Sequence, residues 1–266
     1  MLRARVLTGL VLASLALMAL FFLPTVAIAG VAAVVGFLGA LEWVELRKKG
    51  SSTAFRFSYA GLIALGVVIL WKFFEYSAVV VSIVSIGWVG LLGWVATLVV
   101  RKTPVSCAPG LGLGLFTLVP ALSLLPYIHG QSDNGVVKLL TVLLVVWGGD
   151  IGAYFGGRRF GRSALAPLIS PGKTWEGAWT GLILAASVGT AIFFLFGAPA
   201  DPVIIFCVLA VTAVAAVLAD LFESILKRSA GKKDSGNLLP GHGGVLDRID
   251  SLLGAVPVFS GLTLLL

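Results

Sequence analysis

Apolar segments long enough to cross a lipid bilayer recur from one end of this chain to the other. A crossing takes about 20 predominantly apolar residues, and 59% of the 266 residues are hydrophobic while only 12% are charged. We therefore expect an all-α, polytopic transmembrane helix bundle. About nine spans can be placed, with ends uncertain by a few residues: 5–23, 25–46, 57–73, 77–100, 110–128, 136–157, 175–197, 203–228 and 249–266.

The basic residues give an independent check on this number of spans. Seventeen of the nineteen Lys and Arg residues fall in the N-terminus and in the loops that alternate spans place beside it, and only Lys72 and Lys138 fall opposite. Because basic residues accumulate in short cytoplasmic loops, we expect a cytoplasmic N-terminus and an external C-terminus. Arg3 and Arg5 before an apolar stretch could also mark a cleaved signal peptide, but the length of that stretch favours a retained helix.

Charge and cysteine content argue against nucleic-acid binding and against a disulfide. The positive-inside pattern and contact with anionic lipid head groups account for most of the net charge of +7, so nucleic acid is not an expected partner. Cys107 and Cys207 are expected near opposite membrane faces, and we predict no disulfide between them.

A polar segment, Ser224–Asp250, interrupts this apolar sequence near its end. It contains His242, several glycines that allow close approach of backbone to a ligand, and a dense set of charges. The charged residues are Lys227, Arg228, Lys232, Lys233, Asp234, Asp247, Arg248 and Asp250. This combination indicates a phosphate and metal site, and the alternation of loops places it on the cytoplasmic side.

The carboxylates around this segment are spaced for helices. Four polar residues near the end of the eighth span follow the i, i+3, i+4 and i+7 pattern of one helix face: Asp220, Glu223, Ser224 and Lys227. Asp247 and Asp250 repeat the i, i+3 spacing where the ninth span begins. Two helix ends could thus present oxygen ligands for Mg²⁺ to one cavity. Alternatively, Glu223 and Lys227 form an ordinary ion pair, and Asp250 with Arg248 caps a helix.

A second group of polar residues lies between the sixth and seventh spans. Asp150 is near the inner end of the sixth span, and Ser170–Gly177 precedes the seventh. Basic side chains and free N–H groups at a helix N-terminus favour anion binding. Gly172-Lys173-Thr174 is similar to the end of a Walker A loop, but Pro167 replaces its first glycine and we expect no strand before it. The nearby arginines, Arg158, Arg159 and Arg162, could serve topology and lipid contact alone.

The motifs together resemble those of the phosphatidate cytidylyltransferase (CDP-diacylglycerol synthase) family. The matching segments are Ser224-x-x-Lys227-Arg228, Lys233-Asp234-Ser235-Gly236, Leu239-Pro240-Gly241-His242-Gly243-Gly244, Leu246-Asp247-Arg248-Ile249-Asp250-Ser251, Asp150-x-x-Ala153-Tyr154-Phe155-x-Gly157-Arg158-x-Phe160-Gly161 and Ser170-Pro171-Gly172-Lys173-Thr174-x-Glu176-Gly177. Ala219 departs from the family pattern, which commonly has glycine there. The resemblance covers the C-terminal half in detail, and the N-terminal half matches only as apolar spans.

The resemblance implies an enzyme of the inner (plasma) membrane whose active site faces the cytoplasm. Such an enzyme joins CTP and phosphatidic acid into CDP-diacylglycerol and pyrophosphate, requires Mg²⁺, could also use a monovalent cation such as K⁺, contacts membrane lipids and forms a homodimer. Residues 1–266 would form a single membrane domain, with N-terminal scaffold spans in 1–128 and catalytic spans and cytoplasmic loops in 136–266.

The resemblance also implies roles for individual residues. Expected metal ligands are Asp220, Asp247, Asp150 and Glu223, with Asp250 in support, and the expected catalytic residues are Asp220, Asp247, Lys227 and Asp250. Expected substrate-binding residues are Lys173, Glu176, Ser224, Arg228, Lys233, Asp234, His242 and Arg248. Ser224 and His242 are expected to bind phosphate rather than act as nucleophiles, which favours direct in-line displacement.

Two alternatives of different classes remain at this point. A CTP-dependent polyprenol or dolichol kinase would transfer the γ-phosphate to a lipid alcohol through a similar charged cavity. A secondary transporter of an anionic solute would also place charges inside a bundle, although here they gather at helix ends.

Overall fold

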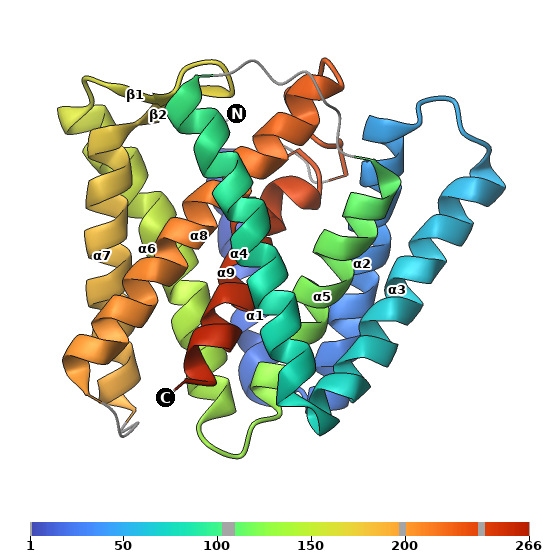
Figure 1. Ribbon diagram of the computed structural model, residues 1–266, viewed down its shortest axis with the longest axis horizontal. Helices are drawn as coiled ribbons and strands as arrows, with labels where there is room; N and C mark the ends of the chain where they lie inside the picture. The colour runs from blue at the N-terminus through green and yellow to red at the C-terminus, as the bar shows by residue number, and fades with distance from the viewer. Residues whose placement is uncertain (1, 103–109, 197–200, 239–242, 266) are drawn as a thin grey trace.

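The computed structural model describes residues 2–102, 110–196, 201–238 and 243–265. Within these ranges the chain forms nine α-helices and one short two-stranded sheet (Figure 1). The helices are α1 Leu2–Phe22, α2 Thr25–Arg47, α3 Thr53–Tyr76, α4 Ala78–Arg101, α5 Leu111–His129, α6 Gly135–Phe160, α7 Trp175–Leu195, α8 Pro202–Ser229 and α9 Leu246–Thr263. The strands are β1 Ala164–Ala166 and β2 Ser170–Thr174. An almost wholly helical, polytopic architecture is thus confirmed.

Seven of the helices in the described ranges, α2 to α8, are long and apolar enough to cross a membrane. The described apolar part of α1, Thr8–Phe22, is shorter. Helix α9 has charged residues near its start, with Asp247 in its first turn and Asp250 just after it. It also begins at Leu246, three residues before the predicted start of its span at 249.

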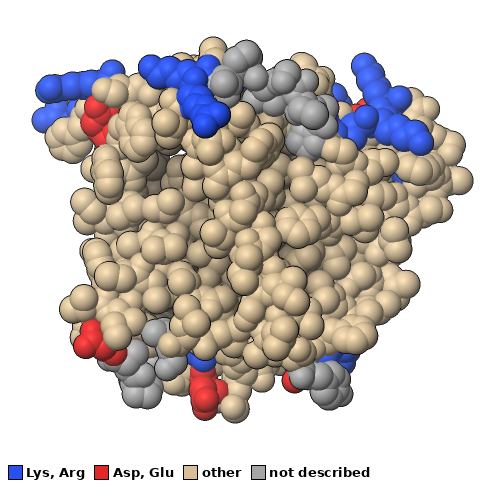
Figure 2. All heavy atoms as spheres, viewed as in Figure 1, with Lys and Arg blue, Asp and Glu red and all other residues tan. Residues whose placement is uncertain are grey.

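The connections between helices gather at two opposite ends of the bundle. The α2–α3, α6–α7 and α8–α9 connections lie together at one end, while the α3–α4 and α5–α6 connections lie at the other (Figure 1). Lys and Arg side chains are concentrated at the first of these, which we name the basic end (Figure 2). The alternation of basic loops in the sequence therefore corresponds to a physical separation of charge across the bundle.

Helix α9 lies at the centre of the bundle and packs against α2, α4, α5, α6 and α8. Leu253 and Val258 belong to a core shared with α2 to α5 and α8, and Ala255, Val256 and Phe259 to a second core with α6 to α8. Because protein rather than lipid surrounds this helix, it can carry charged groups that would be costly on a lipid-facing surface.

Helices α6 and α7 approach closely through small residues. A Cβ atom added to Gly152 of α6 would lie 2.9 Å from Cα of Gly181 on α7, and Thr180 Oγ1 donates a hydrogen bond to the Gly152 carbonyl at 3.1 Å. Small residues at helix interfaces allow this approach. As a result, β2 and the start of α7 lie beside the part of α6 that carries Asp150.

The two strands correct one expectation, because a hairpin does precede α7. β1 and β2 pair antiparallel, and the amide of Ile169 donates to the carbonyl of Ala166 at 3.1 Å, closing a turn that begins at Ala166 and has Pro167 at its second position. Proline favours this second turn position because its φ is already fixed. The Gly172–Thr174 tripeptide lies inside β2 rather than in a loop after a strand, so the rejection of a Walker A loop still stands.

Candidate active site

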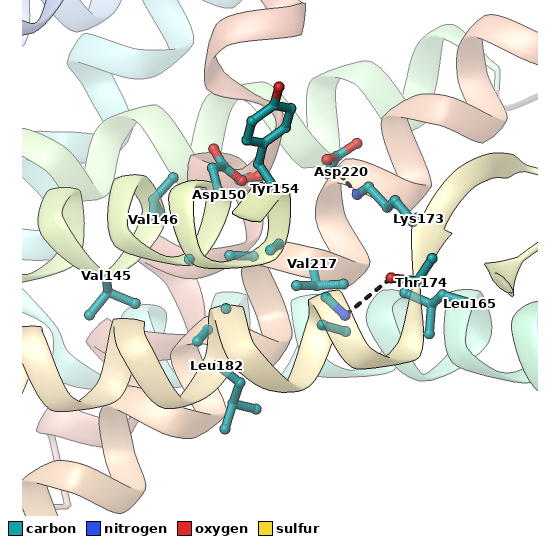
Figure 3. Close-up of a pocket in the computed structure, with 18 of the residues that line it drawn as sticks. Val145, Val146, Asp150, Tyr154, Leu165, Lys173, Thr174, Leu182, Val217 and Asp220 are labelled. Atoms are coloured by element: carbon teal, nitrogen blue, oxygen red, sulfur yellow. Dashed lines mark hydrogen bonds and ion pairs between the residues drawn. The ribbon is translucent and has the colours of Figure 1, made fainter. Parts of the chain in front are cut away.

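A cavity of about 220 Å³ lies between α6, α7 and α8 beside β2. Most of its lining is apolar or glycine, but Asp150, Lys173 and Asp220 bring charge to it from three different elements (Figure 3). Ser251 of α9 also lines it. The cavity is smaller than the roughly 300–1,000 Å³ of a typical small-molecule site, so it can accommodate part of a large substrate.

Lys173 and Asp220 form an ion pair across this cavity, which we name the pocket pair. Lys173 Nζ contacts Asp220 Oδ2, and the two side chains remain 27% and 24% exposed. The position of Lys173 is fixed by its neighbour Thr174, whose Oγ1 accepts a hydrogen bond from the Gly177 amide at 3.1 Å and caps α7. The pair is therefore held in place but stays accessible to a ligand.

Glu176, predicted to bind substrate, contacts protein backbone in this structure. Its Oε2 accepts hydrogen bonds from the amides of Arg162 and Ser163 at 3.0 and 3.2 Å. These bonds join the start of α7 to the segment that enters β1. Glu176 thus orders the hairpin that carries Lys173.

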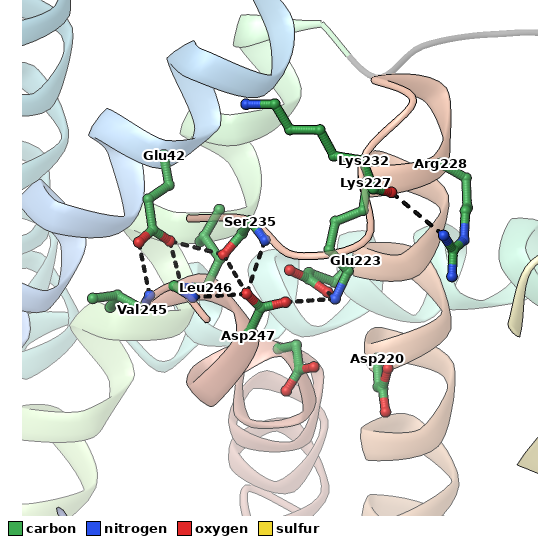
Figure 4. Close-up of polar contacts among 12 residues, drawn as sticks. Glu42, Asp220, Glu223, Lys227, Arg228, Lys232, Ser235, Val245, Leu246 and Asp247 are labelled. Carbon is green, nitrogen blue, oxygen red and sulfur yellow. Dashed lines mark hydrogen bonds and ion pairs between the residues drawn. The ribbon is translucent and has the colours of Figure 1, made fainter. Parts of the chain in front are cut away.

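A second group of charges surrounds Lys227 at the end of α8. Its Nζ contacts Glu223 of the same helix and Asp247 Oδ1 of α9, the latter at 2.6 Å (Figure 4). Glu223 is only 3% exposed and Asp247 only 9%. Buried charges require such pairing, since an unpaired one carries a large desolvation cost. The i,i+4 pair considered from sequence is present, as part of a larger network.

The other oxygen of Asp247 holds the loop between α8 and α9. Oδ2 accepts hydrogen bonds from the amide and the hydroxyl of Ser235 and from the amide of Gly244, each at 2.8 Å. The chain turns next to this oxygen at Gly243, whose φ of +80° is easily adopted only by glycine. Both carboxylate oxygens of Asp247 are therefore engaged by protein donors.

Glu42 of α2, which is not among the site residues predicted from sequence, contacts this loop as well. Its oxygens accept hydrogen bonds from the amides of Val245 and Leu246 at 2.8 and 2.9 Å and from the Ser235 hydroxyl at 2.9 Å (Figure 4). The available signal was a carboxylate placed inside a largely apolar span, which is unusual unless it has a polar partner.

The pocket pair and the Lys227 network are electrostatically connected. The charge of Asp220 acts on Asp150, Glu223 and Asp250, and Arg248 acts on Asp150. Among the described residues, five carboxylates therefore influence one another: Asp150, Asp220, Glu223, Asp247 and Asp250. The nearby cations are Lys173, Lys227 and Arg248. A bound cation would reduce the repulsion among these carboxylates.

The remaining predicted residues have varied surroundings. Asp250 Oδ1 accepts from the Ser251 amide at 2.7 Å, and Ser224 is buried on α8. Arg228 donates through Nε to the Ile169 carbonyl and through Nη1 to the Lys232 carbonyl, both at 3.5 Å. Lys233, Asp234 and Arg248 are exposed. His242 and Cys107 lie outside the described residues, and Cys207 is a free thiol.

The donor atoms suit a hard cation, although they are not gathered around one point. Carboxylate oxygens are the ligands that Mg²⁺ prefers, and substrate phosphates and water normally complete its coordination. In the described part of the chain, no group of three or more His, Cys, Asp or Glu residues is placed to hold a metal ion. Lysines contact these carboxylates instead: Lys173 contacts Asp220, and Lys227 contacts Glu223 and Asp247.

Comparison with known proteins agrees with this arrangement of motifs. The model of the cytidylyltransferase family matches residues 3–266. A Pseudomonas aeruginosa phosphatidate cytidylyltransferase is 38% identical over 271 residues, covering 98% of this chain and 97% of the relative. The enzymes of the same name from Haemophilus influenzae and Brucella suis are 36% and 34% identical, covering 98% and 96% of this chain and 98% and 90% of the relatives. The resemblance drawn from the motifs is confirmed, and this chain belongs to the cytidylyltransferase family.

Proposed function

We propose that this protein is an integral membrane phosphatidate cytidylyltransferase, which joins CTP and phosphatidic acid into CDP-diacylglycerol and pyrophosphate. Relatives with that name match nearly the whole chain at 34–38% identity. The structural observation that carries the proposal is the pocket pair, a lysine and a carboxylate that remain accessible between helices of membrane-spanning length. A lipid phosphate and a nucleotide triphosphate could both reach such a site.

The reaction brings two polyanions together, so positive charge must compensate their repulsion. An oxygen of the lipid phosphate attacks the α-phosphorus of CTP, a new P–O bond forms, and the bond to pyrophosphate breaks. Lys173 would exchange Asp220 for a phosphate oxygen, and Arg228 and Arg248 would bind further oxygens. Lys233 and Asp234, which are also predicted to bind substrate, are exposed on the loop between α8 and α9. Positioning and charge compensation supply most of the catalysis in such transfers.

Mg²⁺ is the cofactor that we propose, since the donor set consists of carboxylates. Asp220 would hold it together with Asp150 or Asp250, and the ion would neutralise charge on the transferred phosphoryl group. Asp247 could contribute only Oδ1, after releasing Lys227, because its Oδ2 already accepts three hydrogen bonds. A monovalent cation such as K⁺ is a further proposal, which rests on the family resemblance and on the several carboxylates that lie near one another here.

We propose direct displacement without a covalent intermediate. The attacking phosphate is already anionic and needs no general base, and Ser224 is buried on α8. With a chirally labelled α-thio-CTP, the product should show inverted configuration at phosphorus. Retained configuration, or a cytidylylated protein trapped in the absence of lipid, would contradict this mechanism.

Product analysis tests the proposed function directly. Detergent-solubilised protein incubated with labelled CTP, phosphatidic acid and Mg²⁺ should yield CDP-diacylglycerol and pyrophosphate in equal amounts. Formation of CDP and a phosphorylated lipid alcohol would indicate a lipid kinase instead. Transport of an anionic solute without any nucleotide chemistry would indicate a transporter.

We further propose that the protein lies in the inner membrane with its basic end in the cytoplasm, where CTP is available. In a background without Cys107 and Cys207, Ser132→Cys should react with an impermeant thiol reagent outside spheroplasts, and Asn237→Cys should not. Both positions are exposed. Labelling of Asn237→Cys from outside would contradict the proposed orientation.

The family resemblance also leads us to propose a homodimer, which light scattering in detergent would measure.

A further inference from the structure

Glu42 connects the N-terminal helices to the charged loop through three short hydrogen bonds. We name the group formed by Glu42, Ser235, Val245, Leu246 and Asp247 the Glu42 clamp (Figure 4). Glu42 comes from α2, whereas the other members belong to the loop and to the start of α9. Glu42 lies 193 positions from Ser235 and 204 from Leu246 in the sequence, so the clamp joins two distant parts of the chain.

The clamp satisfies backbone groups that the helix itself cannot satisfy. The amides of Val245 and Leu246 are at the N-terminus of α9, where no carbonyl lies one turn earlier to accept them. The N-cap residue of α9 is Val245, whose side chain makes no capping hydrogen bond. The Glu42 carboxylate accepts both amides, and its negative charge also favours the positive end of the helix dipole. Glu42 thus fixes where α9 begins and how it is rotated.

The loop is pressed against the Glu42 carboxylate, which leaves little freedom for either. A Cβ atom added to Gly236 would lie 2.6 Å from Glu42 Oε1. One added to Gly244 would collide with both Glu42 and the Ser235 hydroxyl. Glycines at these two positions therefore permit the close contact that the three hydrogen bonds require.

The Ser235 hydroxyl transmits this restraint to the charged network. It lies 2.9 Å from Glu42 Oε2 and 2.8 Å from Asp247 Oδ2, so its one hydrogen is shared between two carboxylates. Asp247 in turn contacts Lys227, which contacts Glu223. A continuous path of polar contacts therefore runs from α2 through the loop to α9 and α8.

A second contact from α2 supports the same helix end. Arg47 Nη2 donates to the carbonyl of Leu226 at 2.8 Å, next to Lys227 in the chain. Glu42 and Arg47, five positions apart on α2, thus hold the start of α9 and the end of α8, the two helix ends whose carboxylates interact.

We propose that Glu42 is a positioning residue for the cytidylyl transfer. By accepting the Val245 and Leu246 amides and the Ser235 hydroxyl, it holds α9 so that Asp247 and Asp250 keep their places relative to Asp220. This inference rests on the proposed function. A residue on α2 then determines how well the carboxylates of α8 and α9 bind their cation.

The decisive variant is Glu42→Gln, with Glu45→Gln as the matched control on the same helix. Glutamine keeps the size of the side chain but places an NH₂ group opposite one of the three donors. Glu45 forms only partly exposed ion pairs, with Arg56 at 3.5 Å and Lys232 at 3.8 Å. Both purified variants are assayed for pyrophosphate release while Mg²⁺ and phosphatidic acid are varied separately.

We expect Glu42→Gln to raise the Mg²⁺ concentration for half-maximal rate by about 10-fold or more, the usual effect of losing a group that orients metal ligands. Its KM for phosphatidic acid should change by less than about twofold, because the pocket pair is untouched. Hydrogen exchange measured by mass spectrometry without Mg²⁺ or substrate should be faster at the amides of Ser235, Val245 and Leu246. Glu45→Gln should resemble the wild type in all three measurements.

The inference is overturned if Glu42→Gln keeps both the wild-type Mg²⁺ dependence and slow exchange at these amides. It is also overturned if KM for phosphatidic acid rises as much as the Mg²⁺ requirement. If Glu42→Gln does not fold, Ser235→Ala decides: the bridge is lost while the two backbone bonds remain, and the Mg²⁺ requirement must still rise. A wild type without cytidylyltransferase activity would refute the proposed function, while the exchange measurement would still test the clamp.

Discussion

The pocket pair and the Glu42 clamp use the same chemical groups in opposite ways. In the pocket, Asp220 forms an ion pair with Lys173, and both side chains remain about one-quarter exposed. In the clamp, the Asp247 side chain is only 7% exposed, and its two oxygens contact one lysine and three hydrogen-bond donors. A carboxylate in the first setting can exchange its partner for a ligand, whereas one in the second is held in place.

This contrast separates two requirements of a transfer reaction between charged substrates. Some groups must be free to bind phosphate or a cation, and their partners in the ligand-free protein must be weak enough to release. Other groups must keep a fixed geometry, because small displacements of reacting groups are costly in rate. The structure places these roles on adjacent helices, with Asp220 acting electrostatically on Glu223 and Asp250.

The largest expected effect is on turnover, from Asp220→Asn. The amide removes the negative charge that we propose for cation binding in the pocket, so kcat should fall more than about 100-fold, beyond the loss typical of residues that only orient metal ligands. Glu75→Gln is the matched control, because Glu75 pairs with Lys72 on α3. Steady-state pyrophosphate release measures kcat, and circular dichroism verifies folding. Near-normal turnover in folded Asp220→Asn would remove this residue from the site.

The next largest effect is on stability, and it compares Lys173 of the pocket pair with Lys227, which contacts Asp247 of the Glu42 clamp. Lys227→Met leaves Glu223 and Asp247 buried without their shared cation, and should lower the free energy of unfolding by about 3–5 kcal/mol. Lys173→Met breaks a more exposed pair and should cost no more than about 1 kcal/mol. Denaturant titration in one detergent measures both. Equal losses for the two variants would contradict the distinction between held and accessible charges.

The sequence predicted most of the fold because bilayer-spanning length is visible in the distribution of apolar residues. Each of the nine expected spans overlaps a helix in the described ranges, and seven of these helices are long and apolar enough to cross a membrane. Helix α9 begins earlier than the apolar pattern does, because Glu42 accepts the amides of Val245 and Leu246. The β1–β2 hairpin was missed because its strands have only three and five residues and flank a proline turn. Such short strands do not show the alternation of apolar and polar residues that predicts a strand.

The site was predictable as separate motifs but not as an assembly. Asp220 and Lys173 were both identified, yet nothing local to either segment indicates that they pair. Glu42 was missed because its partners lie about 200 residues away, and a glutamate near the end of an apolar span does not show which backbone amides it will meet. Helix spacing determines which residues share a face, whereas only packing determines which faces meet.

A smaller effect is expected from the helix contact that forms one wall of the pocket. Gly181→Ala places a Cβ atom 2.6 Å from the Gly149 carbonyl oxygen and 3.1 Å from Cβ of Ala153, which forces α6 and α7 apart. Such overpacking typically costs about 1–3 kcal/mol. Gly90→Ala is the control, because its Cβ would meet nothing within 4 Å. A lower midpoint of thermal unfolding is expected for Gly181→Ala alone, and unchanged stability would mean that the helix pair adapts without cost.

The smallest effect is expected where an ion pair lies outside both regions. Arg56 and Glu45 approach to 3.5 Å with side chains 38% and 35% exposed, so water and salt screen their attraction. Arg56→Ala should therefore change the free energy of unfolding by less than about 1 kcal/mol. Replacing Arg47 with alanine should lower the free energy of unfolding by more, because the Leu226 carbonyl at the end of α8 loses the guanidinium donor and keeps only the Ser229 hydroxyl. Thermal unfolding at low and high salt tests both variants. A salt-independent loss for Arg56→Ala as large as that for Arg47→Ala would show that burial does not determine which charged contacts of this protein stabilise it.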